Sequence, residues 1–227
     1  MSVQVQLLPS TKPVLKPRSY DVRQYSAGLK RTADLCLVLV TLPLWLPLCI
    51  VISAVVATTS YGPAIFRQRR IGLHGVSFYV WKFRTMRVDA EEHMATVLES
   101  DPTLREEWER NRKLQDDPRV TVVGRLLRKA SLDELPQLFN VLFGQMSLVG
   151  PRPLPEYHLS EAPDDFAAAR QSVLPGLTGL WQIKGRRGAI EDIIKYDTEY
   201  LRSRGFAYDL AVIAKTVTVV VRTDGAV

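Results

Sequence analysis

Residues 131–153 have the sequence SLDELPQLFNVLFGQMSLVGPRP. Two carboxylates, Asp133 and Glu134, stand side by side ahead of an apolar run, and the stretch ends with Arg152 between two prolines. A proline fixes its own φ near about −65° and restricts the residue before it, so the backbone at Arg152 has little freedom. The stretch therefore combines a pair of acidic groups with a conformationally restricted cation.

The start of this stretch also fits an ordinary helix beginning. Ser131 followed by Glu134 three residues later matches a capping box, with Ser131 as the N-cap. Pro136 would then lie inside the helix and leave the carbonyl of Leu132 without its helical partner. A free carbonyl beside two carboxylates is an oxygen site that suits Mg²⁺. On these residues the structural and the chemical interpretation both stay open.

The two carboxylates need not share a role, because neighbouring helical residues point about 100° apart. One can attack an electrophile while the other holds a metal. Aspartate forms covalent acyl-phosphates, and attack on a diphosphate requires cations and a divalent metal to neutralise the phosphoryl oxygens. The chain supplies candidate phosphate-binding cations for such a site, namely Lys82, Arg84, Arg128 and Arg152.

The composition favours a basic protein that works near anionic groups. The 227 residues carry a net charge of +6, which fits anionic lipid or a phosphate-bearing substrate. The aromatic-plus-basic patterns of nucleic-acid binders are absent, as are G-x-G-x-x-G and Walker A sequences. We therefore expect no nucleic acid partner and no dinucleotide- or P-loop-type cradle.

An apolar segment near the N-terminus predicts membrane insertion. No Asp, Glu, Lys or Arg occurs between Leu35 and Phe66, and about 20 apolar residues suffice to cross a bilayer. Pro43 and Pro47 interrupt the segment and favour a kink. Basic residues flank both ends, which favours the cytoplasmic side for both. The prediction is a re-entrant helix–break–helix, with a kinked single span as the alternative, and Asp34 paired with Lys30 at one flank.

The remaining sequence predicts a mostly helical α+β body. Gly72 and Gly75 bracket the turn of a β-hairpin, and Asp101–Pro102 divides two charged helices within residues 89–113. Further helices are expected over 161–173 and 190–203, with an apolar, interfacial or core segment over 208–221. Between the first two lies a glycine-rich loop, 173–188, that carries Gln182 and Arg186. The predicted division is a disordered tail (1–27), the membrane helix (28–64) and a cytosolic catalytic domain (65–227).

These motifs together resemble the bacterial sugar transferase family, the monotopic phosphoglycosyl transferases. The resemblance covers about residues 28–222 and rests on LKRTAD, FRQRRIG, KFRTM, SLDELPQLFNVLFGQMSLVGPRP and PGLTGLWQIKGR, in that order. Residues 106–137 look most like exopolysaccharide-initiating galactose- or glucose-1-phosphate transferases. The resemblance implies a re-entrant helix on the cytoplasmic face of the bacterial inner membrane. It does not name the sugar, and the oligomeric state, including a homo-oligomer, stays open.

The resemblance also implies a mechanism. A UDP-sugar would donate a sugar-1-phosphate to undecaprenyl phosphate and release UMP through a covalent phospho-sugar intermediate on Asp133. Glu134, next to Asp133, would coordinate Mg²⁺. The implied phosphate- or nucleotide-binding residues are Lys82, Arg128, Arg152, Gln182 and Arg186.

One departure and two rival functions accompany this interpretation. Many family members break the membrane helix at Ser-Pro, whereas this chain has Leu46-Pro47, so Pro43 and Thr41 are the residues left to shape the break. The first rival is a glycosyltransferase that releases UDP. The second is a non-catalytic membrane scaffold of polysaccharide assembly, which should tolerate Asp133→Asn.

Overall fold

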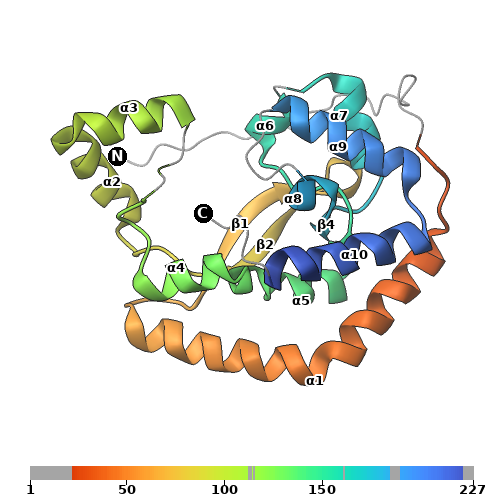
Figure 1. Cartoon of the computed structure of the whole chain (residues 1–227), viewed down its shortest axis with the longest axis horizontal. Helices are drawn as coiled ribbons and strands as arrows, with labels where there is room; N and C mark the ends of the chain where they lie inside the picture. The colour runs from red at the N-terminus through yellow and green to blue at the C-terminus, as the bar shows by residue number, and fades with distance from the viewer. Residues whose placement is uncertain (1–21, 112–113, 115, 161, 185–189, 222–227) are drawn as a thin grey trace.

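The computed structural model describes residues 22–111, 114, 116–160, 162–184 and 190–221 (Figure 1). Most of the predicted tail and Arg186 lie outside these residues. The described chain is α+β and mostly helical, as predicted, and it contains two small two-stranded sheets. A long apolar helix lies along one side of this body (Figure 1).

Helix α1 (Ala27–Thr59) is bent but unbroken. Pro43 and Pro47 both lie inside it, and Figure 1 shows the bend near the middle of the helix. The predicted helix–break–helix is therefore one continuous kinked helix in this structure. Each proline removes a single N–H and crowds the preceding turn, which bends the helix, while the turns on either side keep their hydrogen bonds.

Thr41 and Trp45, each two residues before a proline of α1, donate side-chain hydrogen bonds to backbone carbonyls of the same helix. The hydroxyl of Thr41 donates to the carbonyl of Leu37 at 2.7 Å, and the indole N–H of Trp45 donates to the carbonyl of Val38 at 3.1 Å. A threonine bonded to the carbonyl four residues earlier tends to bend a helix. Thr41 thus contributes to the bend in a chain that lacks the Ser-Pro pair.

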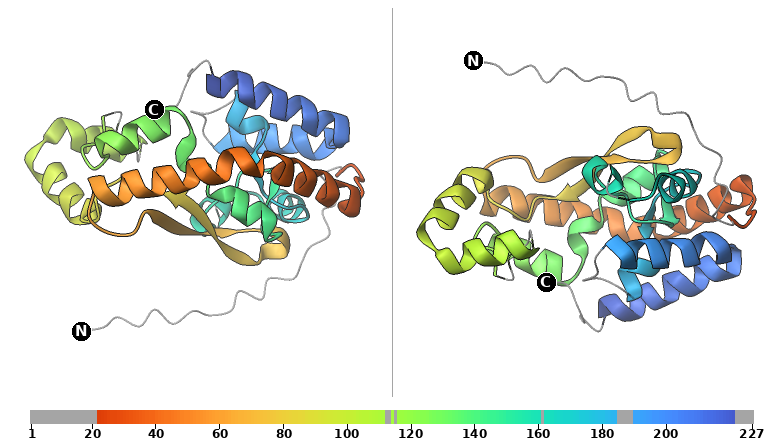
Figure 2. Two further views of the ribbon diagram at one scale, coloured as in Figure 1. Left: turned by 90° about the horizontal axis from the view of Figure 1, so that it is seen from below. Right: turned by 90° about the horizontal axis from the view of Figure 1, so that it is seen from above.

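One face of α1 packs on the body and the opposite face is exposed. Figure 2 shows α1 crossing the body when the molecule is viewed from below. The buried positions recur at helical spacing and are Asp34, Val38, Trp45, Cys49, Ile52 and Val56. On the exposed face, Val40 and Leu44 have 77% and 76% of their surface accessible. Of the described helices, α1 is the one long and apolar enough to cross a membrane by length and composition.

The predicted hairpin is confirmed. Strands β1 (Ile65–Ile71) and β2 (Ser77–Phe83) pair antiparallel around a short 3₁₀ turn, η1 (Leu73–Gly75). Asn140 binds the other edge of β2, where its side-chain oxygen accepts from the N–H of Trp81 at 3.1 Å and its NH₂ donates to the carbonyl of Tyr79 at 2.8 Å. Asn140 therefore fixes the helix that follows the two carboxylates against the hairpin.

The charged segment after the hairpin forms an arm that projects to one side in Figure 1. Its helices are α2 (Ala90–Ser100) and α3 (Pro102–Asn111), and the side chain of Asp101 caps α3 as predicted, accepting from Thr103 N at 2.9 Å. Helix α4 (Val122–Lys129) then returns to the hairpin. A Cβ at Gly124 would lie 2.1 Å from the carbonyl oxygen of Thr85, so glycine permits this close approach.

The C-terminal half contains a sheet that the sequence did not predict. Strand β3 (Ser147–Val149) pairs in parallel with β4 (Gly176–Thr178). The predicted glycine-rich loop thus includes β4 and helix α8 (Leu180–Lys184). The other elements are η2 (Leu132–Glu134), α5 (Gln137–Leu142), α6 (Glu156–Ser160), α7 (Asp164–Gln171), α9 (Ile190–Ser203) and α10 (Phe206–Val221). Helices α7, α9 and α10 match the three predicted segments, and α8 contacts both α9 and α10. Figure 2 shows α9 and α10 on the same side of the molecule.

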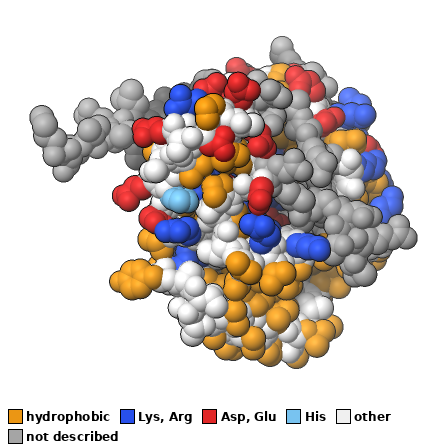
Figure 3. Space-filling model, turned by 60° about the vertical axis from the view of Figure 1, so that its left-hand side comes forward, with side chains coloured by type: hydrophobic (Ala, Val, Ile, Leu, Met, Phe, Trp, Pro, Cys, Tyr) orange, Lys and Arg blue, Asp and Glu red, His pale blue; other side chains and the backbone are white. Residues whose placement is uncertain are grey.

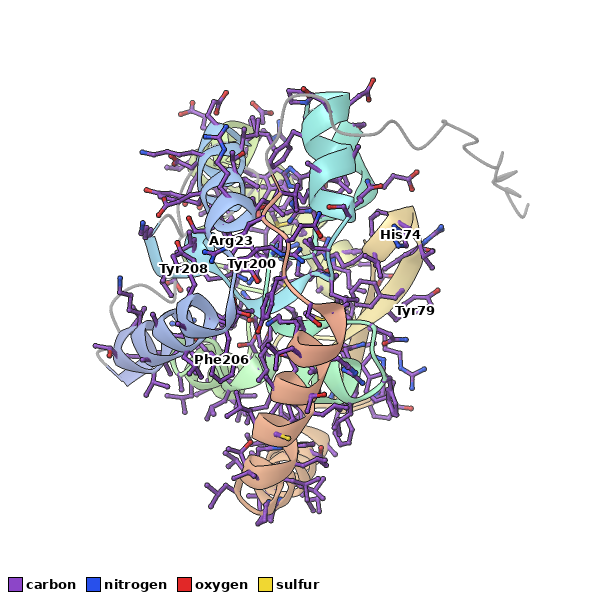
Figure 4. All side chains as sticks on the ribbon, turned by 90° about the vertical axis from the view of Figure 1, so that its right-hand side faces the viewer. Arg23, His74, Tyr79, Tyr200, Phe206 and Tyr208 are labelled. Carbon is purple, nitrogen blue, oxygen red and sulfur yellow. The ribbon has the colours of Figure 1, made fainter. Side chains whose placement is uncertain are left out.

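A buried polar group joins the start of α1 to this half of the molecule. We call it the anchor cluster: Lys30, Asp34, Ser147, Tyr200 and Asp209. Lys30 contacts Asp34 at 3.2 Å, as predicted, and Asp209 at 2.7 Å. Ser147 donates to Asp34 at 2.7 Å, and Tyr200 donates to Asp209 at 3.2 Å. Tyr200 lies where α9 meets α10, beside Tyr208 (Figure 4). Asp34 therefore serves an interior junction rather than the membrane interface.

Candidate functional site

The segment that carries the two carboxylates is not the predicted capping box. Ser131 has a left-handed backbone with φ of 55°, and its side chain makes no capping hydrogen bond. Leu132–Glu134 forms the 3₁₀ turn η2, in which the carbonyl of Leu132 accepts from Leu135 N at 3.2 Å. Pro136 occupies the N-cap position of α5, where no N–H is needed. The predicted free carbonyl at Leu132 is thus wrong, and the carboxylates lie on a tight turn between α4 and α5.

Glu134 lies between two cations from distant parts of the chain. Its Oε1 atom contacts the Lys82 ammonium at 2.7 Å and the Arg152 guanidinium at 2.9 Å. Burial acts to raise the pKa of Glu134, but the charges of Arg152 and Lys82 outweigh it and hold that pKa far below its usual range. In turn, Glu134 raises the pKa of Arg152 despite burial. Glu134 is therefore ionised at neutral pH and fixed in place.

Asp133 has the opposite electrostatic balance. Burial raises the pKa of its carboxyl and the neighbouring charge of Glu134 raises it further, while Lys82, Arg128 and Arg152 oppose both effects. Arg128 is held close by a hydrogen bond from its Nε to the hydroxyl of Thr85 at 2.9 Å. No ion pair joins Asp133 to these cations among the described residues. A partly buried carboxylate without a direct counter-ion is well suited to nucleophilic attack.

Arg152 is fixed by more than its two prolines. Its backbone carbonyl accepts a hydrogen bond from the guanidinium of Arg170, and the Nε of Arg170 contacts Asp197 at 2.7 Å in a buried ion pair. The Arg152 guanidinium also lies over the ring of Trp181, 5.8 Å from its centre. Sequence reasoning missed Arg170 and Asp197, because neither belongs to a motif. The two residues are 27 positions apart in the sequence and lie on different helices, α7 and α9.

The predicted site residues do not all meet. Lys82, Arg128 and Arg152 gather around Asp133 and Glu134, and we call these five residues the carboxylate cluster. Arg84 instead binds the end of α1, donating to the carbonyls of Ser60 and Pro63. Gln182 is buried on α8, next to Trp181, and Arg186 lies outside the described residues. The position of Arg84 just past the end of β2 explains why its side chain departs from that of Lys82.

The carboxylate cluster provides few oxygen ligands for a metal ion. No group of three or more His, Cys, Asp or Glu side chains suited to a metal occurs among the described residues. Asp133 and Glu134 provide two carboxylates, and Oε1 of Glu134 already faces two cations. Mg²⁺ commonly binds one or two carboxylates and takes its other ligands from water and substrate phosphates. The donor set therefore fits Mg²⁺ together with a phosphate ligand.

Comparisons with known proteins point to one family. The profile of the family described as bacterial sugar transferase matches residues 25–223. The undecaprenyl-phosphate galactose phosphotransferase of Salmonella typhimurium is 44% identical over 94% of this chain and 44% of its own length. The exopolysaccharide production protein ExoY of Rhizobium meliloti is 43% identical over 90% of each chain.

A glucose-specific relative gives similar values. The UDP-glucose:undecaprenyl-phosphate glucose-1-phosphate transferase of Klebsiella pneumoniae is 42% identical over 83% of this chain and 39% of its own length. The chain thus spans less than half the length of the Salmonella and Klebsiella proteins and nine-tenths of ExoY. The family match includes both the carboxylate turn and the apolar helix, and this chain belongs to the bacterial sugar transferase family.

Proposed function

We propose that this chain transfers a sugar-1-phosphate from a UDP-sugar to undecaprenyl phosphate and releases UMP, as the first membrane step of exopolysaccharide synthesis. Galactose and glucose are the sugars favoured by the names of its relatives. One observation carries the proposal. Asp133 has no ion pair with any other residue that the structure describes, and its neighbour Glu134 is held ionised by Lys82 and Arg152.

The chemistry proceeds in two displacements at one phosphorus. An oxygen of ionised Asp133 attacks the β-phosphorus of the donor, the bond to the bridging oxygen breaks, and UMP leaves with that electron pair. A phosphate oxygen of undecaprenyl phosphate then attacks the same phosphorus. The bond to Asp133 breaks and its carboxylate is restored. Lys82 and Arg152 offset the charge on the phosphoryl oxygens, and Arg128 favours the ionised form of Asp133.

Mg²⁺ belongs to this proposal as the cofactor. Glu134 would hold it together with Asp133, and substrate phosphate oxygens would complete its coordination. When bound, the ion neutralises phosphate charge and so reduces repulsion of the attacking carboxylate.

The surface supports a membrane location. Figure 3 shows apolar side chains gathered at the base of the molecule, along α1, with Lys and Arg directly above them. Exposed apolar side chains also occur on α4, just after α5 and on α10: Val122, Leu126, Phe143, Leu210 and Val217. An apolar base bordered by cations suits the interface of an anionic membrane. We propose that the kinked α1 enters and leaves on the cytoplasmic face of the bacterial inner membrane.

Nucleotide release tests the reaction. Purified protein in lipid would receive Mg²⁺, undecaprenyl phosphate and each of several UDP-sugars, beside Asp133→Asn. UMP from the wild type alone supports the proposal, and the preferred donor names the sugar. UDP as the product would instead favour the glycosyltransferase, and no turnover with any donor would favour the scaffold.

Accessibility of the chain ends tests the topology. Tags at both termini should resist protease added outside intact cells and become cleavable after lysis. Removal of either tag from intact cells would refute the re-entrant arrangement, whatever the outcome of the nucleotide assay.

A further inference from the structure

The face of the hairpin that presents Lys82 to Glu134 also carries a second cation, Arg70. In the antiparallel register, Phe66 pairs with Lys82, Gln68 with Val80 and Arg70 with Phe78. Side chains alternate between the two faces of a strand. Gln68 and Arg70 therefore share the face of Lys82, whereas Arg69 points to the opposite side.

Within the part of the chain that the structure describes, Arg70 has no carboxylate partner, unlike Lys82 and Arg152. Lys82 and Arg152 share Oε1 of Glu134. The guanidinium of Arg70 donates to the side-chain oxygen of Gln68 at 2.5 Å, and among the described residues no carboxylate lies within ion-pair distance of it.

The surroundings of Arg70 make a guanidinium without a carboxylate partner energetically unfavourable. Its side chain is partly buried, and burial followed by the positive charge of Arg152 lowers the pKa of its guanidinium, with weaker opposition from Tyr157 and Glu134. Placing two cations near each other in a partly buried position is unfavourable unless an anion lies between them. The arrangement thus has an unmet requirement for negative charge beside Arg152.

We propose that Arg70, oriented by Gln68, binds a substrate phosphate group together with Arg152. The inference rests on the proposed function and adds a phosphate-binding residue to it. A guanidinium matches the oxygens of a phosphate with paired N–H groups, and the hydrogen bond to Gln68 holds its plane. Both the donor diphosphate and the acceptor monophosphate provide this chemistry.

Separating the two half-reactions tests the proposal and identifies the phosphate. UMP release would be measured with UDP-sugar alone, and transfer to undecaprenyl phosphate would be measured separately. Arg70→Gln should slow at least one step, or raise its KM, by about tenfold or more. Slower release without acceptor assigns Arg70 to the donor diphosphate. Normal release with an accumulated phospho-sugar enzyme assigns it to the acceptor.

Arg69→Gln is the matched control, because it removes an adjacent, exposed arginine from the opposite face of β1. Arg70→Lys should restore part of the loss through its charge, and Gln68→Ala should raise the same KM by a smaller factor. The proposal is overturned if Arg70→Gln, shown by thermal unfolding to be folded, stays within twofold of Arg69→Gln in both steps. If Arg70→Gln does not fold, it is overturned when both Arg70→Lys and Gln68→Ala stay within twofold of Arg69→Gln in both steps. Since every comparison is made relative to wild-type UMP release, failure here leaves the proposed function standing.

Discussion

The carboxylate cluster and the anchor cluster differ in which charge is in excess: cations in the first and carboxylates in the second. In the carboxylate cluster, Asp133 and Glu134 face three cations, and Asp133 has no direct ion pair among the described residues. In the anchor cluster, Lys30 bridges two carboxylates, and hydroxyls of Ser147 and Tyr200 donate to the same acids.

The difference separates a reaction site from an internal joint. Both carboxylates of the anchor cluster have Lys30 as a counter-charge within the chain, so the cluster can hold α1 against β3 and α10 without a ligand. The carboxylate cluster has three cations against two carboxylates, and this excess of positive charge fits the anionic substrate that we propose for it. Excess charge, rather than the number of charged residues, distinguishes the functional cluster.

Asp133→Asn should give the largest change. Removing the nucleophile abolishes the covalent step, so UMP release should fall by on the order of 1,000-fold or more. The measurement is UMP release per enzyme with the preferred donor. Asp89→Asn, which alters an exposed pair with Arg87, should keep wild-type turnover, and equal rates for the two variants would remove Asp133 as the nucleophile.

Asp34→Ala should mainly lower stability. Breaking one side of a buried ion pair costs about 3–5 kcal/mol, because the remaining charged and polar partners stay buried. Thermal and denaturant unfolding in lipid would measure the loss, with Asp89→Asn again as the exposed control. UMP release per folded molecule should stay near that of the wild type. A loss of turnover at unchanged stability would instead place the anchor cluster in the reaction.

Asp197→Asn should lower the catalytic rate by displacing Arg152. It breaks the buried ion pair with Arg170, whose guanidinium holds the backbone of Arg152. A misplaced phosphate-binding cation should lower kcat by roughly 10- to 100-fold. The control is Glu199→Gln, because Glu199 lies on α9 like Asp197 but forms an exposed ion pair with Lys184 of α8. Breaking this exposed pair should change kcat little. Equal kcat values for the two variants would contradict this role.

The two carboxylates should shift stability in opposite directions. Burial and Glu134 raise the folded-state pKa of Asp133, so its ionised form costs stability once the pH exceeds that pKa. Asp133→Asn should therefore raise Tm slightly at neutral pH. The folded-state pKa of Glu134 is lowered, so its stabilisation is present above the unfolded-state pKa and is lost as pH falls through the folded-state pKa. Glu134→Gln should lower Tm at neutral pH.

The pH dependence of turnover gives a related check. Asp133 must be ionised to attack, so UMP release should decline on the acid side at a pH above the usual aspartate pKa. An acid limb within the ordinary aspartate range would show that burial does not govern the nucleophile. The Tm differences of both variants should shrink in acid, because Asp133 becomes protonated in the folded and unfolded states and Glu134 becomes protonated in the unfolded state.

Much of the fold could be predicted from local signals. Glycines bracketed the hairpin turn, Asp101–Pro102 marked a helix start, and an apolar run marked the segment that forms α10. Sheet β3–β4 could not be found this way, since each strand has three residues and the pairing is distant in sequence. The capping box failed because Ser131 adopts a left-handed backbone directly after the end of α4, where its N–H donates to the carbonyl of Arg128.

The site was only partly predictable. Motif residues Lys82, Arg128 and Arg152 do gather around the two carboxylates. Arg84 belongs to the same motif as Lys82 but turns to the end of α1, and motif membership cannot distinguish these outcomes. Arg170 and Asp197 gave no sequence signal, because their role depends on a contact with backbone rather than on a pattern of residue types.

The polar ends of α1 determine what an engineer can exchange. Arg31 donates to the carbonyls of Val141 and Leu142 at the end of α5, and Arg84 holds the opposite end of α1 at Ser60. Lys30 and Asp34 add the anchor cluster. A chimaera that grafts a foreign hydrophobic helix onto this body would keep an apolar segment but lose these internal contacts. Helix α1 is thus a structural part of the body and cannot be exchanged by matching hydrophobicity alone.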